Sequence, residues 1–200
     1  MSLCLFAICL VCSSLLAGVY ALTKAPIETA KAEKNEKAIK EVLPQEAVAI
    51  LEESSVPFEG STYTYNLACD AEGNTVGCAI NVAPAGFGGP ISMKVGFDKN
   101  GVIWNVKVLS HAETPGLGAK CTEAAFSDQF RQFNPAEKNL AVKKDGGDVD
   151  AITASTITSR AYADGLALAA KLFQVIGQTP MPLTDDVIPS EVEESNKKEE

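Results

Sequence analysis

The sequence lacks the side chains from which most enzymes build a catalytic site. His111 is the only histidine among the 200 residues, and no pattern typical of a Ser/His/Asp triad, a Cys/His pair or a phosphate-binding P-loop is present. One histidine also cannot support a Cys/His metal cluster. Because it stands beside a turn, we expect His111 to be a hydrogen-bonding residue rather than a general base. The sequence therefore predicts no independent catalytic site.

Basic residues are too few for binding nucleic acid. The chain has 17 Lys and Arg against 26 Asp and Glu, a formal net charge of −9, whereas nucleic-acid-binding proteins need a basic surface that neutralises phosphates. Much of the acidity lies in residues 185–200, which contain no aromatic residue. Such a composition cannot offset the entropy lost on ordering. We therefore expect residues 181–200 to form a disordered acidic tail.

Charge is absent from the segment Met1–Leu22. A helix of this length reaches about 30 Å, the thickness of the hydrocarbon core of a bilayer. A cleaved signal peptide is the alternative, because Val19–Ala21 offers small residues at a plausible cleavage site. Against it, no basic residue precedes the apolar run, which is also long for a signal peptide. We expect a retained transmembrane anchor over residues 1–23, followed by a helical stalk over residues 24–44.

The remaining patterns predict an α+β fold: one N-terminal transmembrane helix, followed by a single domain with an antiparallel sheet flanked by helices. Four strand-like runs are separated by turn signals, which indicates antiparallel pairing. These runs are Ser61–Leu67, Val76–Val82, Ile91–Phe97 and Val102–Leu109, with a hairpin turn at Asp98–Gly101. Helices are predicted over Ala25–Ala49 with an interruption at Pro44, around Thr122–Phe133, and over Ile157–Ile176 with Gly177 as its cap; Leu140–Lys143 is a candidate strand.

Two cysteines flank a turn-forming segment, Asp70–Thr75, between two predicted strands. A hairpin centred between Gly73 and Asn74 would place Cys69 and Cys78 directly opposite, within reach of a disulfide in an oxidising compartment. The alternative is a pair of reduced cysteines on a half-buried strand pair. The sequence leaves both open.

The most informative segment is Asp150–Ser159, in which small and hydroxyl-bearing residues stand just before a helical pattern. Small side chains leave the backbone N–H groups of a helix start accessible, and these groups favour a phosphate. The alternative is an ordinary N-cap region. Lys143 and Lys144 precede the segment and could add a cation near a phosphate, although paired lysines before a turn are usually only solvated.

A second informative segment, His111–Gly118, contains the sequence Thr-Pro-Gly-Leu-Gly. Pro115-Gly116 is a strong turn signal, and this glycine together with Gly118 would let the backbone approach a flat ligand closely. Leu117 could then lie against the face of that ligand. Glu113 could hold backbone N–H groups of the same loop, as a carboxylate can.

Together with the glycine-rich segment Gly86–Ile91, these two motifs resemble the FMN-binding domain family over roughly residues 45–177. In that family, the motif Asp, two free positions, Ser or Thr, Gly, Ala, Thr carries FMN through a phosphoester on its last Thr. The resemblance implies that Thr156 carries covalent FMN and that Asp150 is the recognition carboxylate. Ala154 stands where Gly is typical and Ser155 where Ala is typical, and both residues are small.

The same resemblance implies an FMN-binding domain over residues 45–180 and further cofactor-binding residues. These are Thr153, Ala154 and Ser155 in the attachment motif, and Thr114, Pro115, Gly116, Leu117 and Gly118 in the loop, with Lys143 as a candidate cation. An electron carrier of this kind needs no catalytic residues, because the cofactor does the chemistry and the protein supplies position and electrostatics.

Within the family, the chain most resembles the G subunits of Rnf complexes, and its compact length favours this resemblance. Rnf complexes are membrane assemblies that move electrons between ferredoxin and NAD and couple this transfer to ion transport. The resemblance implies the other membrane subunits and a flavin transferase as partners. Two alternatives are the C subunits of sodium-translocating NADH:quinone oxidoreductases, which share both motifs, and a flavin-free extracellular binding or scaffold module.

The side of the membrane is predicted differently by two lines of reasoning. Five lysines follow the apolar span, and the positive-inside rule would place the domain after them in the cytoplasm. They are Lys24, Lys31, Lys34, Lys37 and Lys40. The family resemblance implies the periplasmic or extracellular side of the cytoplasmic membrane, and we expect that side.

Overall fold

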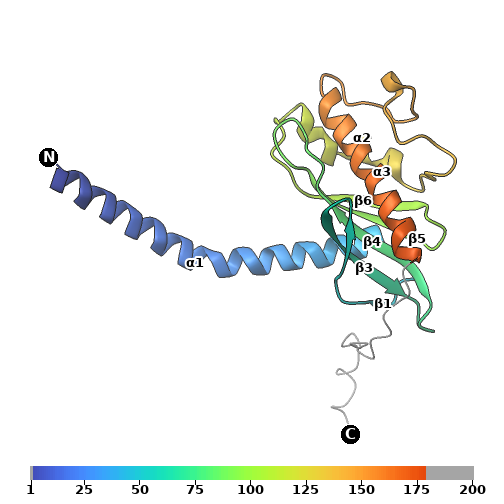
Figure 1. Ribbon diagram of the computed structural model, residues 1–200, viewed down its shortest axis with the longest axis horizontal. Coiled ribbons are helices and arrows are strands. Elements are labelled where there is room, and N and C mark those ends of the chain that lie inside the picture. Colours follow the sequence, from blue (N-terminus) through green and yellow to red (C-terminus); the bar gives the residue numbers. More distant parts are fainter. Residues whose placement is uncertain (1, 179–200) are drawn as a thin grey trace, which may run out of the picture. The chain divides into compact units, whose positions relative to one another are not determined.

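The computed structural model describes residues 2–178, so the predicted acidic tail lies outside the described residues. The chain divides into two compact units, one ending at Lys37 and one beginning at Ala38. The described part has one long N-terminal helix, an antiparallel sheet and a second long helix packed on that sheet (Figure 1). This is the α+β fold that the sequence predicts.

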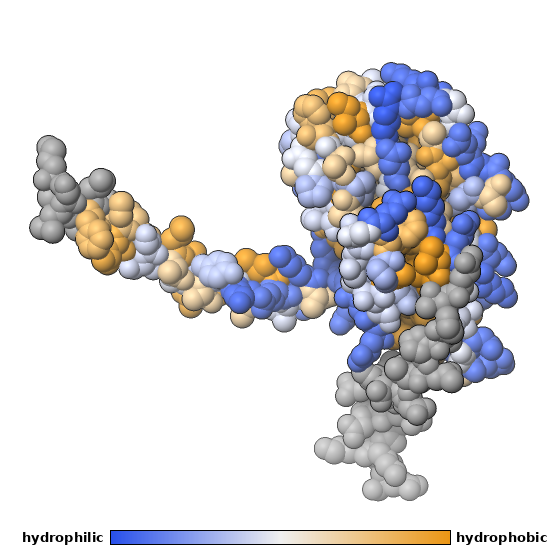
Figure 2. Space-filling view, in the orientation of Figure 1, coloured by the Kyte–Doolittle hydropathy of each residue, from blue (hydrophilic) through white to orange (hydrophobic). Residues whose placement is uncertain are grey.

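Helix α1 runs without interruption from Ser2 to Val42. It contains an apolar stretch, with a mean hydropathy of 1.5, long enough to cross a membrane by length and composition. Figure 2 shows hydrophobic residues exposed on this helix. The helix ends directly before Leu43, because a residue that precedes a proline, here Pro44, is disfavoured in the α conformation. The predicted helix after Pro44 is wrong: the chain turns there and enters the sheet.

The sheet has the strand order β1-β3-β4-β5-β6, with β2 pairing beside β1 on β3, and all pairs are antiparallel. The strands are β1 Ala49–Ile50, β2 Ser54–Phe58, β3 Ser61–Cys69, β4 Thr75–Val82, β5 Ser92–Asp98 and β6 Ile103–Ser110. The four predicted runs are β3 to β6, and the predicted turn at Asp98–Gly101 is present, with the Gly101 N–H donating to the Asp98 carbonyl. The short β1 and β2 were missed because they offer no long alternating pattern.

One face of the sheet is covered by helix α3, Thr156–Gln178. Apolar side chains of β4 and β5 pack against it, and Val106 of β6 belongs to the same core cluster; the strand residues include Ile80, Met93, Val95 and Phe97. From α3, Phe173 stacks on Phe97 with ring centroids 5.1 Å apart, and Tyr162 stacks on Phe130 at 5.1 Å. This is the main core of the domain.

The opposite face is covered by the last residues of α1 and by Leu43, which follows the helix. Ile39, Val42 and Leu43 form a second, smaller apolar cluster with Ala68 and Ala79. A Cβ on Gly96 would collide with the carbonyl of Val42, so only glycine permits this approach.

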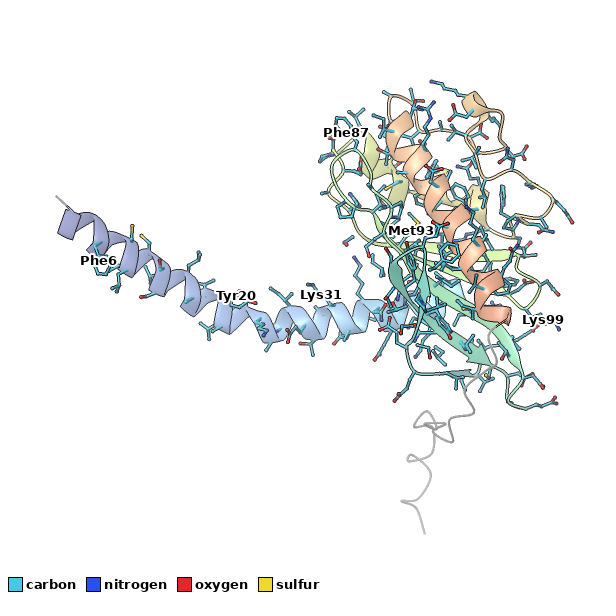
Figure 3. All side chains as sticks on the ribbon, viewed as in Figure 1. Phe6, Tyr20, Lys31, Phe87, Met93 and Lys99 are labelled. Atoms are coloured by element: carbon cyan, nitrogen blue, oxygen red, sulfur yellow. The ribbon has the colours of Figure 1, made fainter. Side chains whose placement is uncertain are left out.

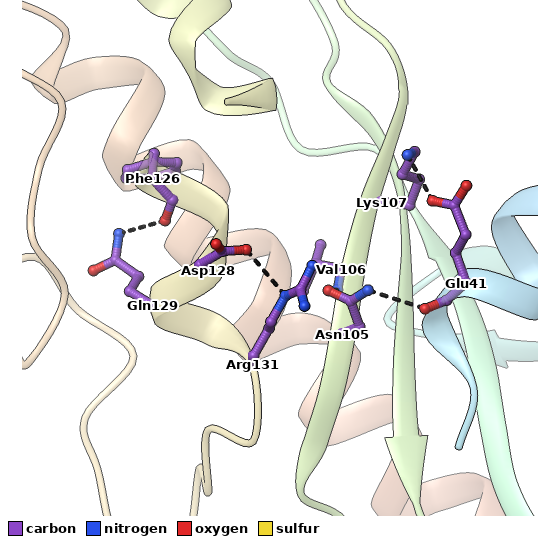
Figure 4. A network of polar contacts seen from close by, with 8 residues as sticks. All are labelled: Glu41, Asn105, Val106, Lys107, Phe126, Asp128, Gln129 and Arg131. Atoms are coloured by element: carbon purple, nitrogen blue, oxygen red, sulfur yellow. Dashed lines mark hydrogen bonds and ion pairs between the residues drawn. The ribbon is translucent and has the colours of Figure 1, made fainter. Parts of the chain in front are cut away.

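Polar contacts at the same place tie the end of α1 to β6. The Glu41 carbonyl accepts from Asn105 Nδ2 at 2.9 Å, and the Glu41 carboxylate pairs with Lys107 at 2.6 Å (Figure 4). The last residues of α1, from Ala38 on, are therefore part of the same compact unit as the sheet.

Three further predictions need correction. The predicted helix over Thr122–Phe133 is broken into short turns: η1 Gly118–Thr122, α2 Ala124–Ser127 and η2 Asp128–Phe130. The predicted strand Leu140–Lys143 is wrong, because that segment makes one parallel bridge, Val142 to Val149, and then enters η3, Lys143–Asp145. Gly177 is not a cap but lies inside α3, which continues to Gln178.

The predicted opposition of Cys69 and Cys78 is also wrong. A register shift between Ala68 and Cys69 moves the strand pairing, so that Cys69 faces Thr75 and Cys78 faces Leu67. Both thiols are free and buried, and burial raises the pKa of the Cys78 thiol to about 12. The alternative of two reduced cysteines is the one that the structure has.

Candidate functional site

The three motifs meet at one end of the domain, around the buried carboxylate of Glu113. One oxygen of this carboxylate accepts the backbone N–H of Gly88, in the glycine-rich loop between β4 and β5, at 2.9 Å. The other accepts the hydroxyl of Thr158, near the start of α3, at 2.6 Å. Figure 1 shows both loops at the same end of the domain as the start of α3. Segments far apart in the sequence thus share one side chain.

The glycines of the two loops make this convergence possible. A Cβ on Gly86 or on Gly118 would collide with the Glu113 carboxylate, and a Cβ on Gly88 would collide with the carbonyl of Ala112. On Gly118 it would also lie 2.7 Å from Thr158 Oγ1. On the side where a Cβ would lie, the space beside Gly118 is thus taken by Glu113 and Thr158.

Gly116 has a different role in the same loop. It is exposed, its φ of +77° is the left-handed conformation that such a turn requires, and nothing lies within 4 Å of where a Cβ would be. The turn is closed by the Thr114 carbonyl, which accepts from the N–H groups of Leu117 and Ala119, both at 3.2 Å. Thr114, Pro115 and Leu117 are exposed on the same turn.

His111 supports the loop by a hydrogen bond, as predicted. Its Nδ1 accepts the backbone N–H of Glu113 at 3.2 Å. Among residues 2–178, no group of three His, Cys, Asp or Glu side chains is arranged to hold a metal ion.

Helix α3 begins at Thr156, inside the predicted attachment motif. The turn before it is held by the Ser159 hydroxyl, which accepts the Ile152 N–H at 2.9 Å and donates to the Ser155 carbonyl at 3.0 Å. Of the hydroxyl-bearing residues 155–159, Ser155, Thr158 and Ser159 are buried, whereas Thr156 is partly exposed. The first-turn N–H groups of a helix have no partner within the helix.

Ala154 adopts a left-handed backbone conformation, with φ +60°. Thr153 beside it is exposed, on a turn. The family pattern has Gly at position 154, and the observed conformation supplies the physical reason, since a Cβ makes it unfavourable.

We expect Ala154→Gly to raise the free energy of unfolding by about 0.5–1 kcal/mol. Relief of the left-handed strain, about 1–2 kcal/mol, outweighs the extra entropy of glycine in the unfolded chain. Urea unfolding of the two proteins measures the difference. Ala167→Gly in the middle of α3 is the control and should lower stability by about 1 kcal/mol. A loss of stability in Ala154→Gly would contradict the argument from strain.

Asp150, the predicted recognition carboxylate, is exposed and held from two sides. Its carboxylate pairs with Lys143 at 2.7 Å. Its backbone N–H donates to Gln129 Oε1 at 2.8 Å, and its carbonyl accepts from Gln129 Nε2 at 3.2 Å. Lys143 is thus a partner of Asp150, which places the predicted cation beside the attachment motif.

A second ion pair fastens the same region to α3. Arg160 binds both carboxylate oxygens of Asp145, at 2.6 and 2.7 Å. The hydrogen bonds and the charge of this guanidinium hold the pKa of the Asp145 carboxyl below its ordinary value. No local pattern predicts this pair, because the two residues belong to elements that meet only in the folded chain.

Large apolar side chains are exposed at the convergence of the motifs. Phe87 is 69% exposed, Leu117 43% and Ile157 53%. Each directly precedes a residue that meets Glu113, namely Gly88, Gly118 or Thr158. Figure 3 labels Phe87 at this end of the domain, and Figure 2 shows hydrophobic surface there. Sequence reasoning named Leu117 but missed Phe87 and Ile157.

Comparison with known proteins agrees with these motifs. Residues 86–171 match the FMN-binding domain, and residues 1–42 match the RnfG N-terminal region. The chain is 36% identical over 159 residues to the G subunit of the ion-translocating oxidoreductase complex of Methanosarcina acetivorans, covering 78% of this chain and 84% of that protein. It is also 36% identical over 178 residues to the protein of the same name from Shewanella piezotolerans, covering 82% and 84%.

Among solved structures, the fold is similar to the C subunit of the Na(+)-translocating NADH-quinone reductase from Parabacteroides distasonis. The TM-score is 0.50 with 20% sequence identity, and the match covers 74% of this chain and 96% of that chain. At this identity the likeness concerns the fold alone.

Proposed function

Since this chain belongs to the family of ion-translocating oxidoreductase complex G subunits and contains an FMN-binding domain, we propose that it is a membrane-anchored electron carrier whose FMN is bound covalently to Thr156. The observation that carries the proposal is the place of Thr156. It is the first residue of α3 and the one hydroxyl of residues 155–159 that is not buried, at the end of the domain where the motifs meet.

The residues around Thr156 suit a flavin phosphate and ring. A phosphoester at Thr156 would leave a negative charge at the N-terminus of α3, where the helix dipole contributes typically about 0.3–1 kcal/mol. Asp150 is the first residue of the attachment motif, and its carboxylate forms an ion pair with Lys143. Phe87, Leu117 and Ile157 offer apolar cover for a flat ring. Bound FMN supplies the redox chemistry, by accepting and releasing electrons, and the protein positions it.

The experiment that tests this proposal is a mass measurement on the denatured chain. The protein is produced in cells with and without a flavin transferase and then denatured. We expect one FMN per chain with the transferase and none without it, and fragmentation should place the added mass on Thr156. An unmodified peptide around Thr156 in the presence of the transferase would favour a flavin-free binding or scaffold module.

We further propose that α1 anchors the protein in the cytoplasmic membrane, with the flavin domain on the periplasmic or extracellular side. The match of residues 1–42 to the RnfG N-terminal region and the apolar stretch of α1 support the anchor. A reporter that is active only outside the cytoplasm should be active when it is fused after Leu22. A reporter that is active only in the cytoplasm should be inactive at the same position. Fusions that report a cytoplasmic domain would overturn the orientation.

The proposed partners are the other membrane subunits of an Rnf complex, which passes electrons between ferredoxin and NAD and couples them to ion transport. Sequence relatives named as G subunits support this assembly over that of a sodium-translocating NADH:quinone oxidoreductase. Purification of the tagged protein from its native membrane identifies the complex by the proteins that accompany it.

Leu117→Ala should leave the covalent bond intact while changing the visible spectrum or the midpoint potential of the flavin, because it removes apolar cover from the ring. Leu117 is 43% exposed on the surface of its turn, so the domain should stay stable. Spectra and redox titration of the purified protein measure the effect. An unchanged flavin combined with a lower melting temperature would show that Leu117 only stabilises the turn.

A further inference from the structure

We propose that Glu113 is the positioning residue of the flavin site, holding the glycine-rich loop, the Thr-Pro-Gly loop and the start of α3 in the one arrangement that accepts the cofactor. This inference rests on the proposed function, because the arrangement matters only if FMN binds there. It assigns a role to a side chain whose hydrogen bonds go to Gly88 and Thr158 rather than to the proposed attachment residue.

The contacts of the carboxylate carry the inference. Glu113 is 5% exposed, and its two oxygens are engaged by two segments other than its own, through the Gly88 N–H at 2.9 Å and the Thr158 hydroxyl at 2.6 Å. Thr158 stands two residues after Thr156 on α3, and 45 residues after Glu113. The carboxylate therefore links the attachment helix directly to both loops.

The glycines show how closely the loops are built around this side chain. Gly86 and Gly118 both lack the Cβ that would collide with the carboxylate. Neither has the left-handed backbone conformation for which glycine is usually needed. Their lack of a side chain therefore serves the approach to Glu113.

This arrangement fixes the backbone beside three exposed apolar side chains, which together form an apolar platform on the surface. Phe87, Leu117 and Ile157 each precede a residue that touches or closely approaches the carboxylate, and each is exposed. If the loops moved independently, these side chains would not keep one relative arrangement. A fixed apolar platform lowers the entropy lost when a flat ring docks on it.

A merely stabilising role would not require a carboxylate. Removing a carboxylate from water is costly, and an apolar contact between the same loops would hold them at least as well. The carboxylate offers direction instead, since it accepts only from donors at defined positions. Burial of the Cys121 thiol, and secondly the negative charge of Glu113 near it, raise the pKa of this thiol to about 11, so that the thiol stays protonated.

The test uses the full-length protein produced with a flavin transferase, in four variants. Glu113→Ala removes both hydrogen bonds. Glu113→Gln keeps both, because its amide oxygen can accept from Gly88 and its NH₂ can donate to the Thr158 hydroxyl. Thr158→Val removes one bond without a change in shape. Val95→Ala is the control for stability, since Val95 is buried in the middle of β5 and belongs to none of the three motifs.

The readouts are the rate of FMN attachment by intact mass, the midpoint potential of the attached flavin, and the melting temperature. We expect Glu113→Ala to slow attachment about tenfold or more, as misplacement of reacting groups does, and to shift the potential. Glu113→Gln should stay near wild type in both. Thr158→Val should lie between them, and Val95→Ala should lose stability only.

The outcomes separate the inference from the proposed function. A wild-type chain that takes up no FMN overturns both. If the wild type is flavinylated, three results would overturn the inference alone. Glu113→Ala could attach FMN at the wild-type rate, or Glu113→Gln could attach it as slowly as Glu113→Ala. The third is that Val95→Ala slows attachment as much as Glu113→Ala does at an equal loss of melting temperature. If Glu113→Ala does not fold, the comparison of Glu113→Gln with Thr158→Val decides, and equal behaviour of those two overturns the inference.

Discussion

Thr156→Val should yield a folded domain that carries no covalent FMN, even in the presence of a flavin transferase. Valine has nearly the shape of threonine but no hydroxyl, so it cannot form the phosphoester. Thr156 is partly exposed at the first position of α3, and the free energy of unfolding should change by less than about 1 kcal/mol. In-gel flavin fluorescence and intact mass measure the loss, and circular dichroism checks the fold.

Thr158→Val is the matched control for this result. Thr158 is 1% exposed, and its hydroxyl is engaged by Glu113, so the transferase cannot reach it. This variant should still carry FMN, attached more slowly. If Thr158→Val lost the flavin completely while Thr156→Val kept it, the attachment site would be Thr158 and the alignment of the motif would be wrong.

Gly118→Ala should lower the free energy of unfolding by about 2–3 kcal/mol, the upper part of the range of about 1–3 kcal/mol typical when an extra methyl group is forced into a packed site. Its Cβ would collide with the Glu113 carboxylate and lie 2.7 Å from Thr158 Oγ1. Either the loop moves or Glu113 leaves its partners, and each outcome should also reduce FMN attachment. Urea unfolding and intact mass measure the two effects.

Gly116→Ala, two residues earlier in the same loop, is the comparison. Nothing lies within 4 Å of its added Cβ, and the only penalty comes from its φ of +77°, which costs about 1 kcal/mol. The loss of stability should therefore be smaller than in Gly118→Ala. Equal losses would mean that the close approach of Gly118 to Glu113 does not constrain the loop.

Much of the sheet and of α3 could be predicted because their signals are local. The runs that became β3, β4, β5 and β6 differ from the observed strands by at most two residues at either end. The turn at Asp98–Gly101 follows from residues that contact each other within it, including Asp98 Oδ1, which accepts the N–H groups of Asn100 and Val102. The helical period of α3 likewise needs no information from the rest of the chain.

The errors concern segments whose conformation depends on distant partners. The residues around Phe126 and Phe130 form short turns because their rings pack on Tyr162 of α3. Val142 bridges Val149 rather than joining the sheet. Such segments have apolar residues but no regular period that would reveal their course.

The sequence by itself determined the class of the protein. The order of its motifs identified the FMN-binding domain, and the match of residues 86–171 to that domain confirms it. The choice of Thr156 as the attachment residue also comes from the sequence and stays a prediction. These conclusions depend on which residues stand close together along the chain, and that information is present before folding.

The tertiary structure alone decided register, close approach and burial. One register shift between Ala68 and Cys69 separated Cys69 from Cys78, and the end of α1 became part of the domain because Gly96 admits it. Glu113 became the meeting point of three motifs through a hydrogen bond that spans 45 residues of sequence. Local patterns cannot reveal such contacts, because each depends on where two distant segments are placed once the whole core has packed.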